Sequence, residues 1–245
     1  MTNSFPNLNF NRRRRGPLPI VIGILVVASI ALVSLSGFYA DWLWFKSVDF
    51  TEVWSTILLT KATVFVIAGL ATSLVITLNV YIAFRKRPLY VPLTSEADNL
   101  ERYRSQIEPI RRLVLVGLAL VLFYFGGSSA SQLWDTWLLF RNATPFGVTD
   151  PQFGLDISFF AFKLPMYQAL VGWAISTLVF AIIGSAIVHY LYGGIRPQVA
   201  QERTTVAARV QLSVLLGLVV LLKAVAYWLD RYALALKENR LITGL

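Results

Sequence analysis

Lys223 is the residue whose position is least expected, because it interrupts an otherwise uncharged apolar run at 210–229. In a helix it lies roughly 9 Å from the carboxyl end of that run. A lysine at the centre of a bilayer costs about 2.5–3.5 kcal/mol on insertion scales, and less when its ammonium extends toward the headgroups. We interpret Lys223 as a structural lysine of this kind. The functional alternative is contact with an ion, an anionic substrate or a buried acid.

Asp156 is the second candidate, within the phenylalanine-rich segment 150–165. Dipeptides that favour turns precede it, and three phenylalanines follow it between 159 and 162. An aspartate here suits the N-cap of a short helix, where its charge complements the helix dipole. We expect this helix to lie at the outer membrane surface and to lead through Pro165 into the next apolar run. The alternatives are a lid over a binding site or a dock for an extracytoplasmic domain.

Other chemistry has little support in the sequence. There is no cysteine, which excludes disulfides, and a single histidine, His189, which leaves no set of residues for a Cys/His zinc site. No acidic residue lies deep in an apolar run, so we interpret His189 as an interfacial histidine and not as part of a proton relay. We therefore predict no catalytic residue, no cofactor and no metal, and we expect that the protein is not an enzyme.

Three uncharged polar or small features concern helix packing. The small residues at 126–131 either let two helices approach closely, which we favour, or break a helix that lines a substrate path. Asn79 and Gln132 are interpreted as partners in hydrogen bonds between helices.

The elements that must position these residues are five apolar runs. The chain is 56% hydrophobic and 14% charged, against about 25% charged residues in a typical soluble domain. A bilayer core needs about 20 helical residues, and an open sheet cannot satisfy its backbone there. The sequence therefore predicts an all-α, polytopic transmembrane bundle. The expected spans are 17–40, 62–84, 113–134, 165–192 and 210–229.

The basic residues predict the orientation of these spans. Fourteen of the 22 Lys and Arg residues fall in the tail 1–16 and in the connections after the second and fourth spans, whereas seven fall on the opposite side. Positive residues favour the cytoplasmic face, so we expect a cytoplasmic amino terminus. Because the arginines flank membrane ends, their expected partners are anionic lipids at that face, and nucleic acid is not an expected partner.

Several motifs resemble one family. The segment 150–165, the Trp42–Phe45 element after the first span, and the 227–232 element at the end of the fifth are similar to uncharacterised protein family UPF0182. The resemblance implies a large integral membrane protein of actinobacteria or cyanobacteria with further spans and an extracytoplasmic region. It therefore implies that residues 17–245 are the transmembrane part of a longer protein. It supplies no reaction, cofactor or site residue.

These observations predict a multi-pass protein of the cell membrane. The leading hypothesis is a non-enzymatic platform for an extracytoplasmic domain or for other membrane proteins of the cell envelope. A transporter or channel component that uses Lys223 is the alternative, and an envelope enzyme with its catalytic region beyond Leu245 is a third.

Overall fold

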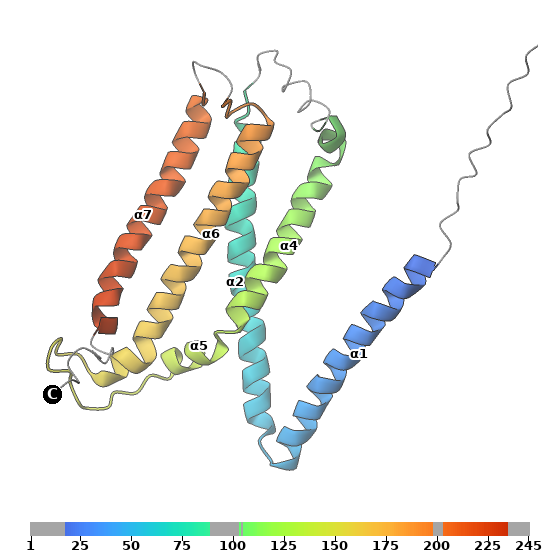
Figure 1. Ribbon diagram of the computed structural model, residues 1–245. Helices are drawn as coiled ribbons and strands as arrows, with labels where there is room; N and C mark the ends of the chain where they lie inside the picture. The colour runs from blue at the N-terminus through green and yellow to red at the C-terminus, as the bar shows by residue number, and fades with distance from the viewer. Residues whose placement is uncertain (1–17, 89–102, 104, 198–202, 235–245) are drawn as a thin grey trace, which may run out of the picture. The chain divides into compact units, whose positions relative to one another are not determined.

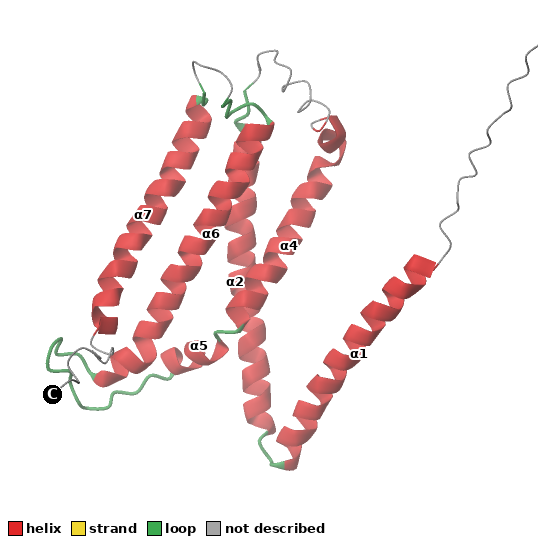
Figure 2. Cartoon of the chain, in the orientation of Figure 1, coloured by secondary structure: helices red, strands yellow, loops and turns green. Residues whose placement is uncertain are grey.

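The computed structural model describes residues 18–88, 103, 105–197 and 203–234. Within these ranges the regular secondary structure consists of helices joined by loops, with no β-strand (Figure 1, Figure 2). Two isolated backbone bridges, Thr149 to Asp156 and Ile195 to Thr204, close loops between helices. The predicted all-α class is confirmed for this part of the chain, while the predicted basic tail 1–16 lies outside the described residues.

Five of the helices are long and apolar enough to cross a membrane. These five, in chain order, are α1 (Leu18–Ser47), α2 (Thr51–Arg85), α4 (Arg111–Ser131), α6 (Leu164–Leu191) and α7 (Val206–Leu234). Each contains most of one predicted run but extends past it. α2 begins well before the predicted start at 62, because residues such as Glu52 and Lys61 end an apolar run without ending a helix.

The chain divides into two compact units, Met1–Thr56 and Ile57–Leu245. In the first unit a tight turn joins α1 to α2, and Asp49 takes a left-handed backbone conformation there, with φ of 58°. The N–H of Phe50 donates to the carbonyl of Phe45 at 2.9 Å, and the rings of Phe38 and Trp54 pack edge to face at 5.0 Å. The turn is therefore closed by backbone hydrogen bonds and an aromatic pair.

In the second unit, α2 and α4 touch through glycines. A Cβ atom added to Gly127 would lie 2.7 Å from the carbonyl oxygen of Phe65, and one added to Gly69 would lie 2.6 Å from that of Phe123. The Ser73 hydroxyl also donates across the contact to the Ala119 carbonyl at 2.8 Å. Small residues thus permit close approach of the two backbones. The close-packing interpretation of 126–131 is confirmed, and α4 continues unbroken to Ser131.

The core of the second unit is small and lies between α2, α6 and α7. Its buried apolar members are Ile76, Val80, Ala181 and Leu215. Large apolar side chains cover the outside of the same helices, including Leu59 on α2 at 70% exposure and Leu221 on α7 at 64%. Figure 1 shows α6 and α7 lying side by side along their length. This arrangement, apolar both inside and outside, is the one expected of helices surrounded by lipid.

Between α4 and α6 the chain forms two short helical elements. The helix α5 (Trp134–Arg141) follows α4 after a two-residue turn. The phenylalanine-rich segment forms a π-helical turn, η2 (Phe159–Lys163), that continues directly into α6. The three phenylalanines therefore lie on an extension of α6 and not on a separate helix. The predicted location at the membrane surface stays a prediction.

Candidate functional site

Asp156 organises the loop that leads into α6. Its carboxylate accepts hydrogen bonds from the backbone N–H groups of Phe146 at 3.0 Å, Gly147 at 2.9 Å and Ser158 at 2.8 Å. The Ser158 hydroxyl and these N–H groups all favour the charged carboxylate, and they hold the pKa of Asp156 well below its usual range. The expected bond to the start of the following helix is present, and Asp156 also holds the two loop residues ten and nine positions earlier.

Asp150 supports the same loop from the other side. Its carboxylate accepts from the N–H groups of Gln152 at 3.0 Å and Phe153 at 2.8 Å. Its own N–H donates to the carbonyl of Leu155 at 2.8 Å, and Gly154 takes a left-handed conformation with φ of 65°. Two carboxylates and the Thr149 to Asp156 bridge therefore give this loop a defined backbone.

An aromatic cluster joins this loop to the end of α7. The Tyr232 ring lies 4.9 Å from the Phe153 ring and 5.4 Å from that of Phe159, measured between centroids. Tyr232 is only 7% exposed, and Phe160 and Leu229 are buried beside it. In the sequence, Tyr232 stood out only as part of the 227–232 element at the end of the fifth predicted span. The sequence did not predict that Tyr232 packs against residues more than 70 positions earlier.

Lys223 lies on the exposed side of α7. Its Nζ atom sits 5.3 Å from the centroid of the Tyr227 ring, one turn nearer the carboxyl end of the helix. A lysine stem that runs along the helix and places its charge over an aromatic face is typical of a lysine that extends toward the headgroups. The structure does not bring Lys223 near Asp156, the other predicted candidate, and Lys223 does not line the cavity described below.

A polar network, which the sequence only partly indicated, links α2, α6 and α7. The Gln211 amide nitrogen donates to the Asn79 carbonyl at 2.9 Å and lies 3.3 Å from the Ser185 hydroxyl. The Gln211 amide oxygen faces Nε2 of His189 at 3.0 Å, so that nitrogen carries the proton in this arrangement. The Gln211 nitrogen also lies 3.4 Å from the side-chain oxygen of Asn79, so Asn79 is confirmed as an interhelical partner. The prediction for Gln132 is wrong, because its side chain is exposed in the turn after α4 and makes no hydrogen bond to the described residues. The one signal for Gln211 was a polar residue inside an apolar run.

His189 is buried by this network. The side chain is 1% exposed, and its Nδ1 atom has no hydrogen-bond partner among the described residues. A Cβ atom added to Gly194 would lie 2.9 Å from Nδ1, which shows how closely the following turn covers the ring. His189 is therefore enclosed between helices, because the turn after α6 folds back over it. Its predicted location at the membrane interface stays a prediction.

At the same end of the second unit, Glu108 joins the ends of three helices. Nη1 of Arg87 lies 3.2 Å from both of its carboxylate oxygens, and Nη1 of Arg111 lies 2.9 Å from one of them. The Tyr192 hydroxyl donates to the same carboxylate at 3.4 Å. The Arg87 guanidinium also lies over the Phe84 ring at 4.4 Å. These contacts place the connections that follow α2 and α6 at the same end.

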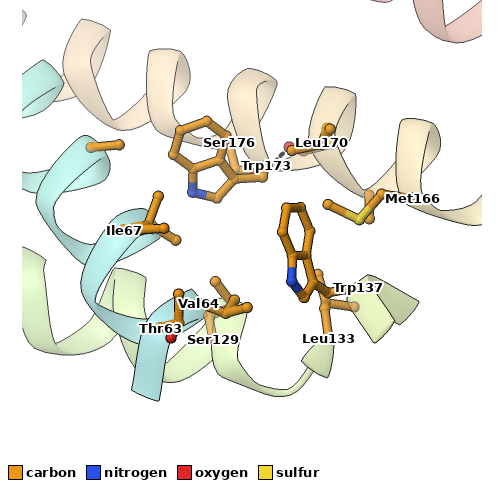
Figure 3. Close-up of a pocket in the computed structure, with 15 residues that line it drawn as sticks. Thr63, Val64, Ile67, Ser129, Leu133, Trp137, Met166, Leu170, Trp173 and Ser176 are labelled. Carbon is orange, nitrogen blue, oxygen red and sulfur yellow. Dashed lines mark hydrogen bonds between the residues drawn. The ribbon is translucent and has the colours of Figure 1, made fainter. Parts of the chain in front are cut away.

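A cavity of about 410 Å³ opens toward the other end, between α2, α4, α5 and α6. Figure 3 shows the indole rings of Trp137 and Trp173 at its wall, with Met166 and Leu170 beside them. The Trp173 N–H donates to the Thr72 hydroxyl at 3.0 Å, which fixes one ring against α2. Small side chains make the remaining space, namely Ala68, Ala71, Ala130, Ala169 and Gly172.

Comparison with known proteins matches the sequence of this chain to one family. The model of the family described as Uncharacterised protein family (UPF0182) matches residues 18–245. A UPF0182 protein of Streptomyces coelicolor is 44% identical over 93% of this chain, and one of Thermobifida fusca is 45% identical over 92%. The matched region spans 23% and 22% of those relatives, so the chain covers less than a quarter of their length. No solved structure matches the chain.

Proposed function

Because this chain belongs to the uncharacterised protein family UPF0182, we propose that it is the membrane-embedded part of a larger cell-envelope protein. In this proposal it acts as a non-enzymatic platform for an extracytoplasmic domain or for partner membrane proteins. Two findings support this: five helices are long and apolar enough to span a bilayer, and the relatives are about four times as long as the matched region.

The proposed orientation has a cytoplasmic amino terminus and five spans in the cell membrane. Support comes from the end of the second unit where Arg87, Arg111 and Arg196 lie near the ends of α2, α4 and α6. Positive residues favour the cytoplasmic face, and their attraction to anionic headgroups would hold them there. The loop containing Asp156 and the end of α7 would then lie on the extracytoplasmic side.

The observation that carries the platform proposal is the packing of Tyr232 between Phe153 and Phe159. It fixes the end of α7 to a loop that two carboxylates already order. A chain continuing beyond α7 would leave from a rigid base and not from a frayed helix end. Transport has less support, because Lys223 lies on the exposed side of α7 and away from the described cavity.

Cysteine labelling tests the orientation, since the chain has no cysteine of its own. Val148→Cys and Lys86→Cys variants of the full-length protein, with any cysteine beyond residue 245 changed to serine, would be treated in intact cells with a membrane-impermeant maleimide. Both side chains are exposed, and they lie at opposite ends of the second unit. We expect labelling of residue 148 in intact cells and of residue 86 only after lysis. The reverse pattern would contradict the orientation.

The platform role is tested by crosslinking in native membranes. The full-length protein and its Phe153→Ala/Tyr232→Ala variant would be crosslinked, purified and compared for co-purified envelope proteins and for protease cleavage after residue 232. We expect the variant to be cleaved faster and to lose partners. Tyr190→Ala, an exposed aromatic change near the other end of α6, is the matched control. Unchanged cleavage and unchanged partners in the double variant would contradict the proposal.

A further inference from the structure

We propose that the cavity between α2, α4, α5 and α6 binds one hydrocarbon chain of an anionic phospholipid, with the lipid phosphate beside Lys61. This proposal rests on the proposed location of the protein in a membrane. The chemistry of the cavity wall selects an apolar occupant. The charge at one end of the cavity selects the headgroup.

Three of the five polar side chains that line the cavity are hydrogen-bonded within the protein, which leaves the Ser129 hydroxyl and the Trp137 N–H. The Thr63 hydroxyl donates to the Leu59 carbonyl at 2.7 Å, and the Ser176 hydroxyl donates to the Gly172 carbonyl at 2.9 Å. The Trp173 N–H is held by Thr72. Among the described residues, the buried polar side-chain atoms that lack a hydrogen bond belong to Thr77 and His189, and neither residue lines the cavity.

A wall with so few free polar groups favours an apolar occupant over water. A buried water molecule needs two to four polar partners, and engineered apolar cavities smaller than this one stay dry and take up apolar ligands. The volume of about 410 Å³ lies within the range of small-ligand sites. A transmembrane helix does not fit, because one turn of a helix about 10 Å in diameter and about 5.4 Å long already occupies roughly this volume. A single hydrocarbon chain is slender enough, and in a bilayer it is always available.

Lys61 supplies the charge complementarity. It is exposed on α2 two residues before Thr63, and its Nζ lies 5.3 Å from the centroid of the Trp134 ring on α5. Trp134 in turn adjoins the cavity-lining Leu133. Tryptophan and lysine together are typical of headgroup depth. A lipid whose phosphate lies beside this ammonium would have its hydrocarbon chain at the end of the cavity.

The test is photo-crosslinking of the full-length protein in vesicles that contain phosphatidylglycerol with a diazirine on one acyl chain. Peptide mass spectrometry would locate the crosslinks, which we expect on Met166, Leu170 or Trp173. Two variants fill the space: Gly172→Leu and Ala169→Leu. A Cβ atom added to Gly172 meets no heavy atom within 4 Å, so Gly172→Leu adds bulk without a backbone clash. We expect several-fold less crosslinking in both variants.

The matched control is Gly217→Leu on α7, where an added Cβ also meets open space and which does not line the cavity. Its crosslinking should equal that of the unmodified protein. Lys61→Gln should reduce crosslinking by phosphatidylglycerol about fivefold, which corresponds to the roughly 1 kcal/mol that one lysine contributes at an anionic surface. Its crosslinking by the uncharged-headgroup analogue phosphatidylcholine should stay the same.

Equal crosslinking of the unmodified protein and both filling variants would overturn the proposal. So would crosslinks confined to the outer surfaces of α2 and α7. A protein that does not fractionate with membranes would overturn the proposed function as well. A membrane-bound protein with the expected cysteine labelling and no crosslinks in the cavity would overturn only the lipid site.

Discussion

His189 on α6 and Gln211 on α7 are hydrogen-bonded, with 3.0 Å between Nε2 and Oε1, and the same glutamine reaches Asn79 on α2. One amide therefore joins three helices. Between apolar helices a hydrogen bond gives orientation that dispersion contacts alone do not, because it fixes the rotation of each helix about its own axis.

Gln211→Leu should destabilise the protein by about 1–2 kcal/mol. The change leaves the buried Nε2 of His189 without its acceptor, and lost interhelical bonds in membranes cost up to roughly that amount. Thermal unfolding in detergent, followed by tryptophan fluorescence, measures it. Gln132→Leu, at an exposed position just after α4, is the control and should leave the transition unchanged. Equal unfolding temperatures of the two variants would show that the network does not stabilise the protein.

Gly127→Ala should destabilise the contact between α2 and α4 by about 1–3 kcal/mol. The new methyl group would lie 2.7 Å from a backbone oxygen of Phe65, and backbone atoms yield less readily than the end of a side chain. Gly117→Ala on the same helix meets open space and should be neutral or stabilising. The comparison is made by unfolding in increasing SDS. If Gly127→Ala left the stability in SDS unchanged, the two helices would separate easily at this point.

Asp156→Asn should destabilise the loop that leads into α6 at neutral pH and have less effect in acid. The pKa of Asp156 is lowered in the folded protein, so its carboxylate contributes stability fully above the ordinary value of 3.8. That contribution is lost as the pH falls from there toward the lower folded-state pKa. Thermal unfolding of the two proteins across this range measures the difference.

The exposed Asp230→Asn is the control for the Asp156 experiment. It should give a difference that is small at every pH. If the gap between the unmodified protein and Asp156→Asn stayed constant down to acid pH, the carboxylate would not be the charged acceptor that its three N–H contacts indicate.

Lys223→Met should change the free energy of unfolding by less than about 0.5 kcal/mol, the usual range for a surface substitution. The ammonium lies on the exposed side of α7 over the Tyr227 ring, so its removal leaves no buried acid without a partner. Unfolding of the full-length protein in detergent is the measurement, with Lys223→Arg as the charge-retaining control. A loss of several kcal/mol in Lys223→Met alone would indicate a buried ion pair.

The sequence by itself determined the number, type and approximate extent of the long helices. A charge-free run of about 20 residues has few alternatives to a helix in lipid, and the runs ending near Ala40, Phe84 and Trp134 are of that kind. The glycines at 126 and 127 also indicated a close helix contact correctly. Asp156 was predicted to begin a helix, and it does accept from the N–H of Ser158.

Only the tertiary structure decided which faces of the helices meet. α2 and α6 are apolar all round, and lipid is as apolar as a protein core, so their periodicity contains no signal for an inward face. The partners of Gln211, the enclosure of His189, the contact of Tyr232 with Phe153 and the cavity beside Trp173 all depend on that choice. These contacts bring together residues that are far apart in the chain. Steric fit between the helices selects them, because hydrophobicity does not distinguish a helix face that meets protein from one that meets lipid.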